Sequence, residues 1–348
     1  MDDFYNEQGI SLKCLNCGSS LTYNPETQRF DCESCHSQFT EEQLSKNAIS
    51  FAEQETFDEE LKDYNCPSCG AEILADDTTT TEFCVYCGNP VVLKGRVTGQ
   101  IKPSLIIPFS INKEKAQQIL VDYLSKYSYV PNSFYKESNL EKITGIYYPF
   151  WEADINTDSS LTADGVKVRT WTIGDRRYTE TSYYKIRRGG DIHFEDISVN
   201  ALKSADKKLV ESVLPYPVKE HIPFKMAYLS GFYSKKNDLN YEDVYGEIKN
   251  KLGGYSKTLL ENTIHGYNSI TINQSVANIM AEKHDYTLLP IWILNYKYRN
   301  KNYTFAVNGV TGKVFGEIPV SKARLGLTFA GIGASIFAVL SILGGLFL

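Results

Sequence analysis

Eight cysteines, arranged in two matched groups, are the residues of this chain best suited to chemistry. Each group consists of two C-x2-C pairs, and 14 residues separate the inner cysteines in both groups. A C-x2-C turn places two sulfurs on one side of a knuckle, so two such turns offer Zn²⁺ four thiolates in a closed tetrahedron. We therefore predict two zinc ribbons with one structural Zn²⁺ each, whose ligands are Cys14, Cys17, Cys32, Cys35, Cys66, Cys69, Cys84 and Cys87.

Four sulfurs leave no open coordination position for water or a substrate, so a metal held in this way stabilises the fold and does no chemistry. His36, next to Cys35, is a fifth candidate ligand, but four thiolates already satisfy the ion. An iron–sulfur cluster also takes four cysteines, although the paired knuckles favour zinc. The start of the chain has no secretory signal pattern, so the thiols should bind metal or stay reduced rather than form disulfides.

The charge of the cysteine-rich segments bears on their partner. The chain carries a net charge of −6, and acidic side chains outnumber basic ones around both groups of cysteines. A ribbon that binds nucleic acid needs a basic face interleaved with aromatic side chains, and neither segment offers one. Protein recognition is therefore the preferred role of the ribbons, with nucleic acid as the alternative.

Composition divides the chain into five segments. The ribbons occupy residues 1–40 and 64–97, and an acidic stretch, residues 41–63, lies between them as a short helix and a spacer. Residues 98–320 are rich in aromatic side chains, which favour strands. The expected fold class is α+β: two N-terminal zinc ribbons, a β-rich antiparallel body with a few helices, and a transmembrane helix over residues 325–348.

Local patterns predict three helices before the C-terminal segment. A capping-box pattern at Thr40 starts the first. The second is expected over residues 113–127, where apolar residues share one face. The third is expected over residues 242–252, because Gly253-Gly254 is a typical helix end.

Prolines between apolar residues recur through the body. Proline lacks an N–H donor and fits the first residue of a strand, which is the position expected for Pro108, Pro149, Pro223 and Pro290. The heptads that begin at Pro149 and Pro290 are alike, which suggests two related β lobes. A hairpin is expected where residues 303–307 and 313–318 flank a turn with two glycines.

The last 24 residues, Leu325 to Leu348, contain no charged side chain. A helix of this length rises about 36 Å, which is enough to cross a hydrocarbon core of about 30 Å. Lys322 and Arg324 precede it, so the positive-inside rule places residues 1–324 in the cytoplasm. We predict a single-pass tail anchor in the cell membrane, with a buried core helix as the alternative.

Small residues recur every four positions in this segment, at Gly326, Ala330, Ala334 and Ala338. Such a stripe lets two helix backbones approach closely and predicts a homo- or hetero-oligomer. Glycine and alanine are also common in membrane helices that do not associate, so both interpretations stay open.

Outside the cysteines, no catalytic motif is recognisable. Glu152 and Asp154 are two apart on an expected strand and share a face, but a solvated pair is favoured over an acid and a base. Arg187-Arg188-Gly189-Gly190 is typical of a surface turn. The body histidines stand apart from one another, at His193, His221, His265 and His284. We therefore expect no enzyme.

Together these motifs resemble those of bacterial double-zinc-ribbon membrane proteins, often described as TFIIB-type zinc-ribbon-containing proteins. The likeness covers nearly the whole chain. It rests on Cys66-Pro67-Ser68-Cys69-Gly70, Cys84-Val85-Tyr86-Cys87-Gly88, Ile106-Ile107-Pro108-Phe109, Gly145 to Trp151, Leu229 to Tyr233 and Leu288 to Glu317. The first ribbon, Cys14 to Cys35, departs from the pattern because it has no proline at the position that Pro67 occupies in the second ribbon. The resemblance therefore leaves the partner of the first ribbon open.

The resemblance implies a membrane-anchored adaptor of an envelope-stress system. The partners that it implies are a related zinc-ribbon membrane protein, an SPFH-type protein and a phage-shock-type coat protein. We therefore expect a non-enzymatic scaffold that recruits partner proteins to the cytoplasmic face of the membrane. The alternative is a membrane-tethered regulator whose zinc ribbons bind nucleic acid.

Overall fold

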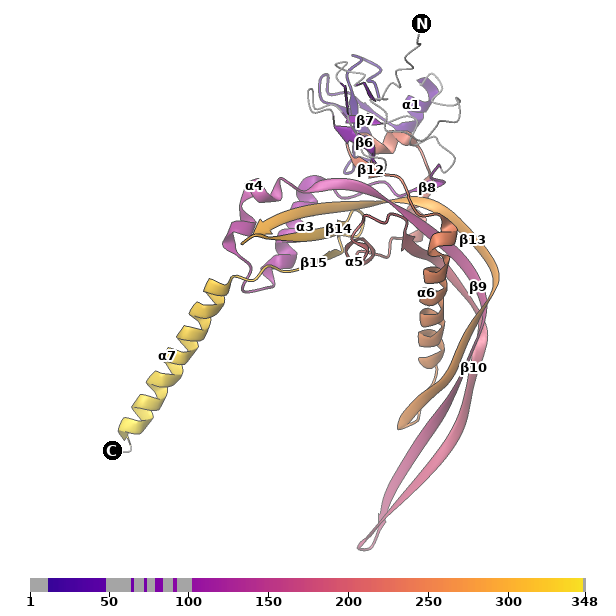
Figure 1. Cartoon of the computed structure of the whole chain (residues 1–348), viewed down its shortest axis with the longest axis vertical. Coiled ribbons are helices and arrows are strands. Elements are labelled where there is room, and N and C mark those ends of the chain that lie inside the picture. The colour runs from indigo at the N-terminus through magenta and orange to yellow at the C-terminus, as the bar shows by residue number, and fades with distance from the viewer. Residues whose placement is uncertain are drawn as a thin grey trace.

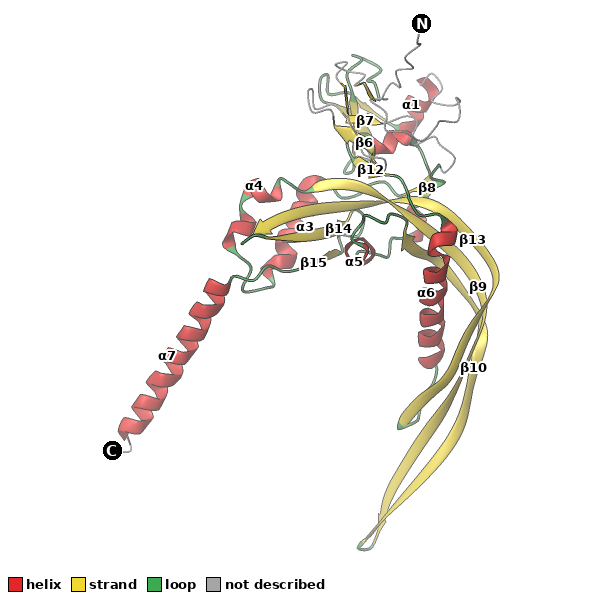
Figure 2. Ribbon diagram, in the orientation of Figure 1, coloured by secondary structure: helices red, strands yellow, loops and turns green. Residues whose placement is uncertain are grey.

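The computed structural model describes residues 12–47, 64–65, 72–73, 79–83, 90–92 and 102–346. These residues form a mixed α+β chain with a small N-terminal sheet, a sheet-rich body and a long C-terminal helix (Figures 1 and 2). The N-terminal part lies at one end of the molecule. A long β arm and the C-terminal helix both leave the body in directions away from it (Figure 1).

The N-terminal sheet has three antiparallel strands, β1 (Leu21–Asn24), β2 (Arg29–Cys32) and β3 (Gln38–Phe39). The predicted capping box is present at the start of α1 (Glu41–Asn47). The Thr40 N–H donates to Gln43 Oε1 at 2.9 Å, and the Gln43 N–H donates to Thr40 Oγ1 at 3.4 Å. The sheet is attached to the body, because the Tyr23 N–H donates to the Ser230 carbonyl at 3.0 Å.

Four short strands follow in the second cysteine-rich segment. They are β4 (Tyr64–Asn65), which pairs with β5 (Glu72–Ile73), and β6 (Thr79–Phe83), which pairs with β7 (Pro90–Val92). Strand β6 also pairs with β12 (Tyr233–Lys235) and so joins the main sheet. The predicted ligands Cys66, Cys69, Cys84 and Cys87 lie outside the described residues.

The body is built on one ten-stranded sheet among the described residues, and both heptads, which were expected to mark two related β lobes, lie in this sheet. Its central strands, β9 (Thr144–Ile173) and β13 (Ser269–Tyr298), are antiparallel, and each carries one of the two heptads, with Pro149 opposite Leu288 and Pro290 opposite Tyr147. The other strands are β8 (Leu105–Ile106), β10 (Arg176–Asn200), β11 (Ile222–Pro223), β14 (Lys301–Asn308) and β15 (Val314–Gly316). Pairing is antiparallel except for two short parallel contacts, β12 with β9 and β13 with β8.

Pro149 and Pro290 lie inside strands rather than at their starts, contrary to the prediction. The Pro149 carbonyl accepts from the Ala201 N–H, so the Pro149 nitrogen faces the side on which β10 ends and β12 begins. The Pro290 carbonyl accepts from the Gly309 N–H, and the Pro290 nitrogen likewise faces the gap between β14 and β8. Each missing N–H therefore falls where no neighbouring strand needs a donor. Neither Pro108 nor Pro223 opens a strand.

The long strands β10, β9 and β13 continue beyond the body as a curved three-stranded arm (Figure 2). Helix α6 (Tyr241–Glu261) lies along one face of the arm and runs through Gly253-Gly254, where the sequence predicted its end. A separate apolar cluster explains the longer helix, since Leu260 of α6 packs against Leu161 and Ile186 of the arm. Burial of this last turn outweighs the poor helix propensity of two glycines.

The remaining helical elements cover the body end of the sheet. Helix α3 (Lys113–Ser125) is present as predicted but ends two residues earlier, and its cap Asn112 accepts from the Lys115 N–H at 2.8 Å. The predicted hairpin is also present, as β14 and β15. The shorter elements are η1 (Asn132–Tyr135), α4 (Glu137–Leu140), α5 (Lys207–Glu211), η2 (Val218–Glu220) and η3 (Met226–Leu229).

The C-terminal helix α7 (Lys322–Leu346) is long and apolar enough to span a membrane. The apolar part of this helix that the structure describes is not buried against the body. The helix is therefore not the buried core helix that was the alternative prediction. Its first turn is attached to the body, because Arg324 Nη1 donates to the Val130 carbonyl at 2.8 Å and to Asn132 Oδ1 at 3.1 Å. The helix therefore leaves the body as an exposed apolar rod (Figure 1).

Candidate metal centre

The first four cysteines lie on two knuckles at the ends of the N-terminal sheet, one before β1 and one after β2. Each knuckle closes in the same way: the Gly18 N–H donates to the Cys14 carbonyl and the His36 N–H donates to the Cys32 carbonyl, both at 2.9 Å. Gly18 and His36 have φ angles of 75° and 58°. The left-handed position after each second cysteine is thus filled once by glycine and once by histidine.

The knuckles bring Cys14, Cys17, Cys32 and Cys35 into one group that could hold a metal ion. The sulfurs of Cys14 and Cys35 are 3.5 Å apart, as are those of Cys17 and Cys32, and all four lie within 4.8 Å of one another. A tetrahedral ion with bonds of about 2.3 Å requires sulfurs about 3.8 Å apart, which is close to this spacing. His36 is not a member of the group.

The surroundings of the exposed cysteines favour the thiolate form, which is the form that ligates metal. Hydrogen bonds with the side chain and backbone of Ser37 lower the pKa of the Cys35 thiol to about 6. Hydrogen bonds with Ser19 likewise lower the pKa of the Cys17 thiol. The Asn16 N–H contacts Cys14 Sγ at 3.4 Å and would stabilise charge on that sulfur.

A second group of metal-ligating side chains lies in the body, and the sequence did not predict it. Glu152, Asp196 and His221 bring their ligand atoms within 4.8 Å of one another. Glu152 was expected to be solvated, but it is 4% exposed, because the segment that carries His221 covers this face of β9. Asp154 accepts a hydrogen bond from the Asp196 N–H at 3.0 Å and lies beside the group.

The centre of this group is a buried ion pair. His221 Nε2 lies 2.8 Å from Glu152 Oε2, and the Ser198 hydroxyl donates to Glu152 Oε1 at 3.0 Å. Burial lowers the pKa of His221, but the hydrogen bond and charge of Glu152 outweigh it and raise that pKa to about 9. Burial, with the charge of Glu152, also raises the pKa of Asp196 to about 6.

The other residues that the sequence singled out do not join either group. His193 contacts Asn156 at 2.7 Å at the edge of the arm, and His284 stacks on Tyr241 with ring centroids 3.7 Å apart. Arg187 and Arg188 lie within strand β10 rather than in a turn, so that prediction was wrong.

Comparison with known proteins gives one informative match. A Bacillus subtilis (strain 168) protein, described as "Uncharacterized protein YdjG", is 32% identical to this chain over 333 residues, which cover 96% of this chain and 97% of that protein. The chain belongs to the YdjG family. No family model and no solved structure matches it. Because the match to YdjG runs nearly end to end, it extends over the cysteine-rich part as well as the body.

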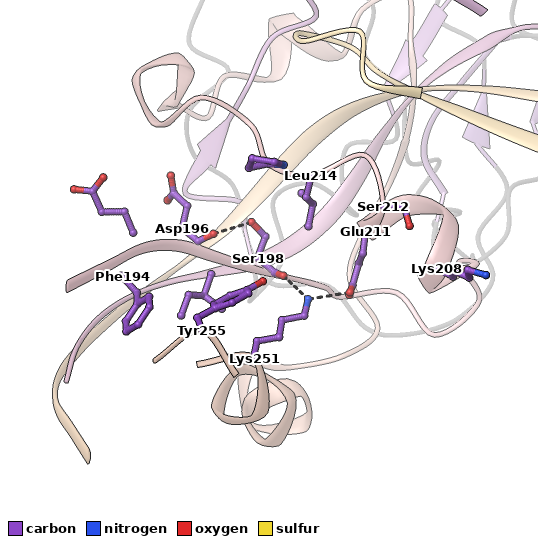
Figure 3. Close-up of a pocket in the computed structure, with 12 residues that line it drawn as sticks. Phe194, Asp196, Ser198, Lys208, Glu211, Ser212, Leu214, Lys251 and Tyr255 are labelled. Carbon is purple, nitrogen blue, oxygen red and sulfur yellow. Dashed lines mark hydrogen bonds and ion pairs between the residues drawn. The ribbon is translucent and has the colours of Figure 1, made fainter. Parts of the chain in front are cut away.

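In this member of the YdjG family, a cavity of about 540 Å³ adjoins the second group (Figure 3). It lies between β10, α5 and α6, and Asp196 is one of its lining residues. On its floor, Lys251 Nζ donates to the Ser198 carbonyl at 2.8 Å and pairs with Glu211 at 2.9 Å. The cavity therefore brings solvent and small solutes to Asp196, one residue of the second group.

Proposed function

We propose that this chain is a non-enzymatic membrane-anchored adaptor that recruits partner proteins to the cytoplasmic face of the cell membrane. One observation carries the proposal: a four-sulfur group, which leaves a bound ion no open position, occurs in the same chain as an exposed apolar helix long enough to span a bilayer. The first feature supports a structural metal and the second a fixed location. Together they favour a scaffold over a soluble catalyst.

The metal that fits the four sulfurs best is Zn²⁺, and we propose two structural ions, the second held by Cys66, Cys69, Cys84 and Cys87. The basic residues Lys322 and Arg324 at the start of α7 support an orientation with the body in the cytoplasm. The partner classes come from the family resemblance: a related zinc-ribbon membrane protein, an SPFH-type protein and a phage-shock-type coat protein of an envelope-stress response. Helix association through the small-residue stripe of α7 stays a prediction.

The test is crosslinking in intact cells followed by purification of the full-length chain from the membrane fraction. Partner proteins and zinc should co-purify with the wild type. Both should be reduced for Cys14→Ser with Cys35→Ser, since the loss of two ligands opens the first site. Ser34→Ala, in the same knuckle, is the matched control and should behave as the wild type. Intact protein that stays in the supernatant, or purified protein without zinc, would contradict the proposal.

One feature favours a second candidate, a membrane-tethered nucleic-acid-binding regulator. Beyond Val166 the arm narrows to the β9–β10 hairpin, and residues 167–188 contain seven basic and two acidic side chains. Trp171 and Tyr178 stack there with ring centroids 5.8 Å apart, and the Arg169 guanidinium lies 5.8 Å from the Trp171 ring. Exposed aromatic rings among cations are what single-stranded nucleic acids bind.

This candidate predicts salt-sensitive retention of single-stranded DNA or RNA by the full-length chain. Retention should fall for Trp171→Ala with Arg169→Ala and should be unchanged for Lys113→Ala, a surface lysine of α3. Retention that is absent, or insensitive to salt and to the hairpin substitutions, would leave the protein adaptor as the better account.

A further inference from the structure

We propose that Glu152, Asp196 and His221 form a metal centre of a different kind, which binds a divalent cation through one imidazole nitrogen and two carboxylate oxygens. The donor set has no sulfur, so it differs in chemistry from the cysteine group. It suits cations that accept nitrogen and oxygen ligands, such as Mn²⁺, Fe²⁺ or Zn²⁺. The proposal does not depend on the adaptor function.

The three side chains come from three separate parts of the fold. Glu152 lies in the middle of β9, and His221 lies between η2 and β11. Asp196 sits in an irregularity of β10, where the register shifts between Phe194 and Ile197. A bulge of this kind turns a side chain out of the regular alternation, and here the Asp196 carboxylate faces His221, with Oδ2 3.8 Å from His221 Nδ1.

The hydrogen bonds that hold the group in place use the other atoms of His221 and Glu152, while Nε2 and Oε2 contact each other. His221 Nδ1 contacts the Val218 carbonyl at 2.8 Å, which fixes the ring and directs Nε2 toward Glu152. Metal-ligating histidines are typically held in this way, through the nitrogen that does not bind the ion. Ser198 holds Glu152 Oε1 at 3.0 Å, so Glu152 Oε2 is the oxygen directed at the site.

The environment of the Asp196 carboxylate is not explained by the ion pair of Glu152 and His221 alone. Its Oδ2 atom is inaccessible to solvent and accepts no hydrogen bond from the part of the chain that the structure describes. A buried carboxylate oxygen without a donor costs about 1–3 kcal/mol. Glu152 already pairs with His221, so the partly buried Asp196 carboxylate adds repulsion unless a further positive charge is present. A divalent cation supplies that charge.

To admit the ion, the ligand atoms, which lie within 4.8 Å of one another, must adjust: those of His221 and Glu152 must separate slightly and the Asp196 carboxylate must move closer. His221 Nε2 and Glu152 Oε2 are 2.8 Å apart, whereas neighbouring ligands of an ion with bonds of about 2.1 Å lie about 3.0–3.4 Å apart. The ion would take the place of the proton between them. Because Asp196 also lines the 540 Å³ cavity, an ion held there keeps positions open for water or an anionic solute from the cavity.

The test uses the full-length chain in detergent micelles, freed of metal with a chelator and titrated with Mn²⁺. Mn²⁺ prefers oxygen and imidazole ligands to thiolates, so it discriminates against the cysteine group. Free Mn²⁺ is measured by electron paramagnetic resonance. We expect one Mn²⁺ per chain for the wild type and for the control His265→Gln, an exposed histidine outside the group. His221→Gln and Asp196→Asn should each weaken binding at least tenfold.

Two further variants separate this centre from the proposed function and from misfolding. Ser198→Ala removes the hydroxyl that contacts Glu152 Oε1 and the Asp196 carbonyl, and should weaken Mn²⁺ binding about tenfold or more, with unchanged circular dichroism. Cys14→Ser with Cys35→Ser should leave Mn²⁺ binding intact even where zinc and partners are lost. Wild-type protein that binds no Mn²⁺, or His221→Gln protein that binds it as His265→Gln protein does, would overturn the proposal.

Discussion

Raising the pH from about 6.5 to about 9 should destabilise the body through the pair of His221 and Glu152, provided that a chelator keeps the site metal-free. Glu152 raises the pKa of His221 to about 9 in the folded chain, whereas an unfolded chain restores the ordinary value of 6.5. Between these values the folded protein binds a proton that the unfolded protein releases. The free energy of unfolding therefore falls as the pH rises through this range, and the contribution is fully present only below about pH 6.5.

The size of the effect follows from the difference between the two pKa values. At about 1.4 kcal/mol per pH unit, it amounts to about 3 kcal/mol. The His221 side chain is only 9% exposed and that of Glu152 only 3%, so solvent screens the pair little. For a body of this size, about 3 kcal/mol corresponds to a fall in melting temperature of about 6–12 °C.

The assay is thermal unfolding of the full-length chain in detergent micelles, followed by near-ultraviolet circular dichroism at several pH values from 6 to 9. Glu152→Gln should lower stability at pH 6 by about 3–5 kcal/mol, because it removes the hydrogen-bonded counter-charge of a buried imidazole and leaves only Asp196, 3.8 Å away. It should also reduce the fall between pH 6.5 and 9. His265→Gln should reproduce the wild-type curve. Glu152→Gln protein with the wild-type dependence on pH would show that this pair is not the cause.

Three other perturbations have expected outcomes. Asp196→Asn should stabilise the metal-free chain at pH 7 by about 1–2 kcal/mol in chemical denaturation. The pKa of Asp196 is raised in the folded chain, so its charged form disfavours folding. A loss of stability would contradict this prediction. Gly309→Ala should lower the free energy of unfolding by about 1–3 kcal/mol in the same assay, since a Cβ atom there would lie 2.6 Å from the Phe109 ring. The control Gly254→Ala, at an open position on α6, should be neutral or stabilising. Arg324→Ala should speed proteolysis at residues 129–132, because two hydrogen bonds hold that segment to α7; an unchanged digestion pattern would argue against the attachment.

Features set by neighbouring residues could be predicted from the sequence. The first cysteine group follows from two C-x2-C turns, whose geometry is local, and the spacing of Cys17 and Cys32 spans a single hairpin. The caps at Thr40 and Asn112 depend on side chains within three residues of the atoms that they bond. The C-terminal helix follows from composition alone.

The lengths of the strands and of α6 could not be predicted, because distant partners decide them. Local rules would end α6 at Gly253 and start strands at Pro149 and Pro290. Packing of Leu260 on the arm extends the helix, and gaps between neighbouring strands accept the prolines.

The group of Glu152, Asp196 and His221 was missed for a similar reason. His221 is 69 positions from Glu152 in the sequence, so no spacing rule joins them. The side chain of Asp196 reaches them only because of the irregularity in β10. The one local signal was a carboxylate, Glu152, in the middle of an apolar strand that follows Pro149, and such a carboxylate requires a buried partner.

The antiparallel pairing of β9 with β13 also determines when the sheet of the arm can be completed during synthesis. Thr144 lies opposite Ile293, and the end of β13, Tyr298, comes 98 positions after the end of β10, Asn200. At a synthesis rate of about 5–20 residues per second, the nascent β9–β10 hairpin waits about 5–20 s for its third strand. Through that interval one edge of β9 is an open template for pairing with other chains. The apolar helix α7 leaves the ribosome after β13, so a chaperone that shields nascent strand edges until the arm closes would raise the yield of folded protein.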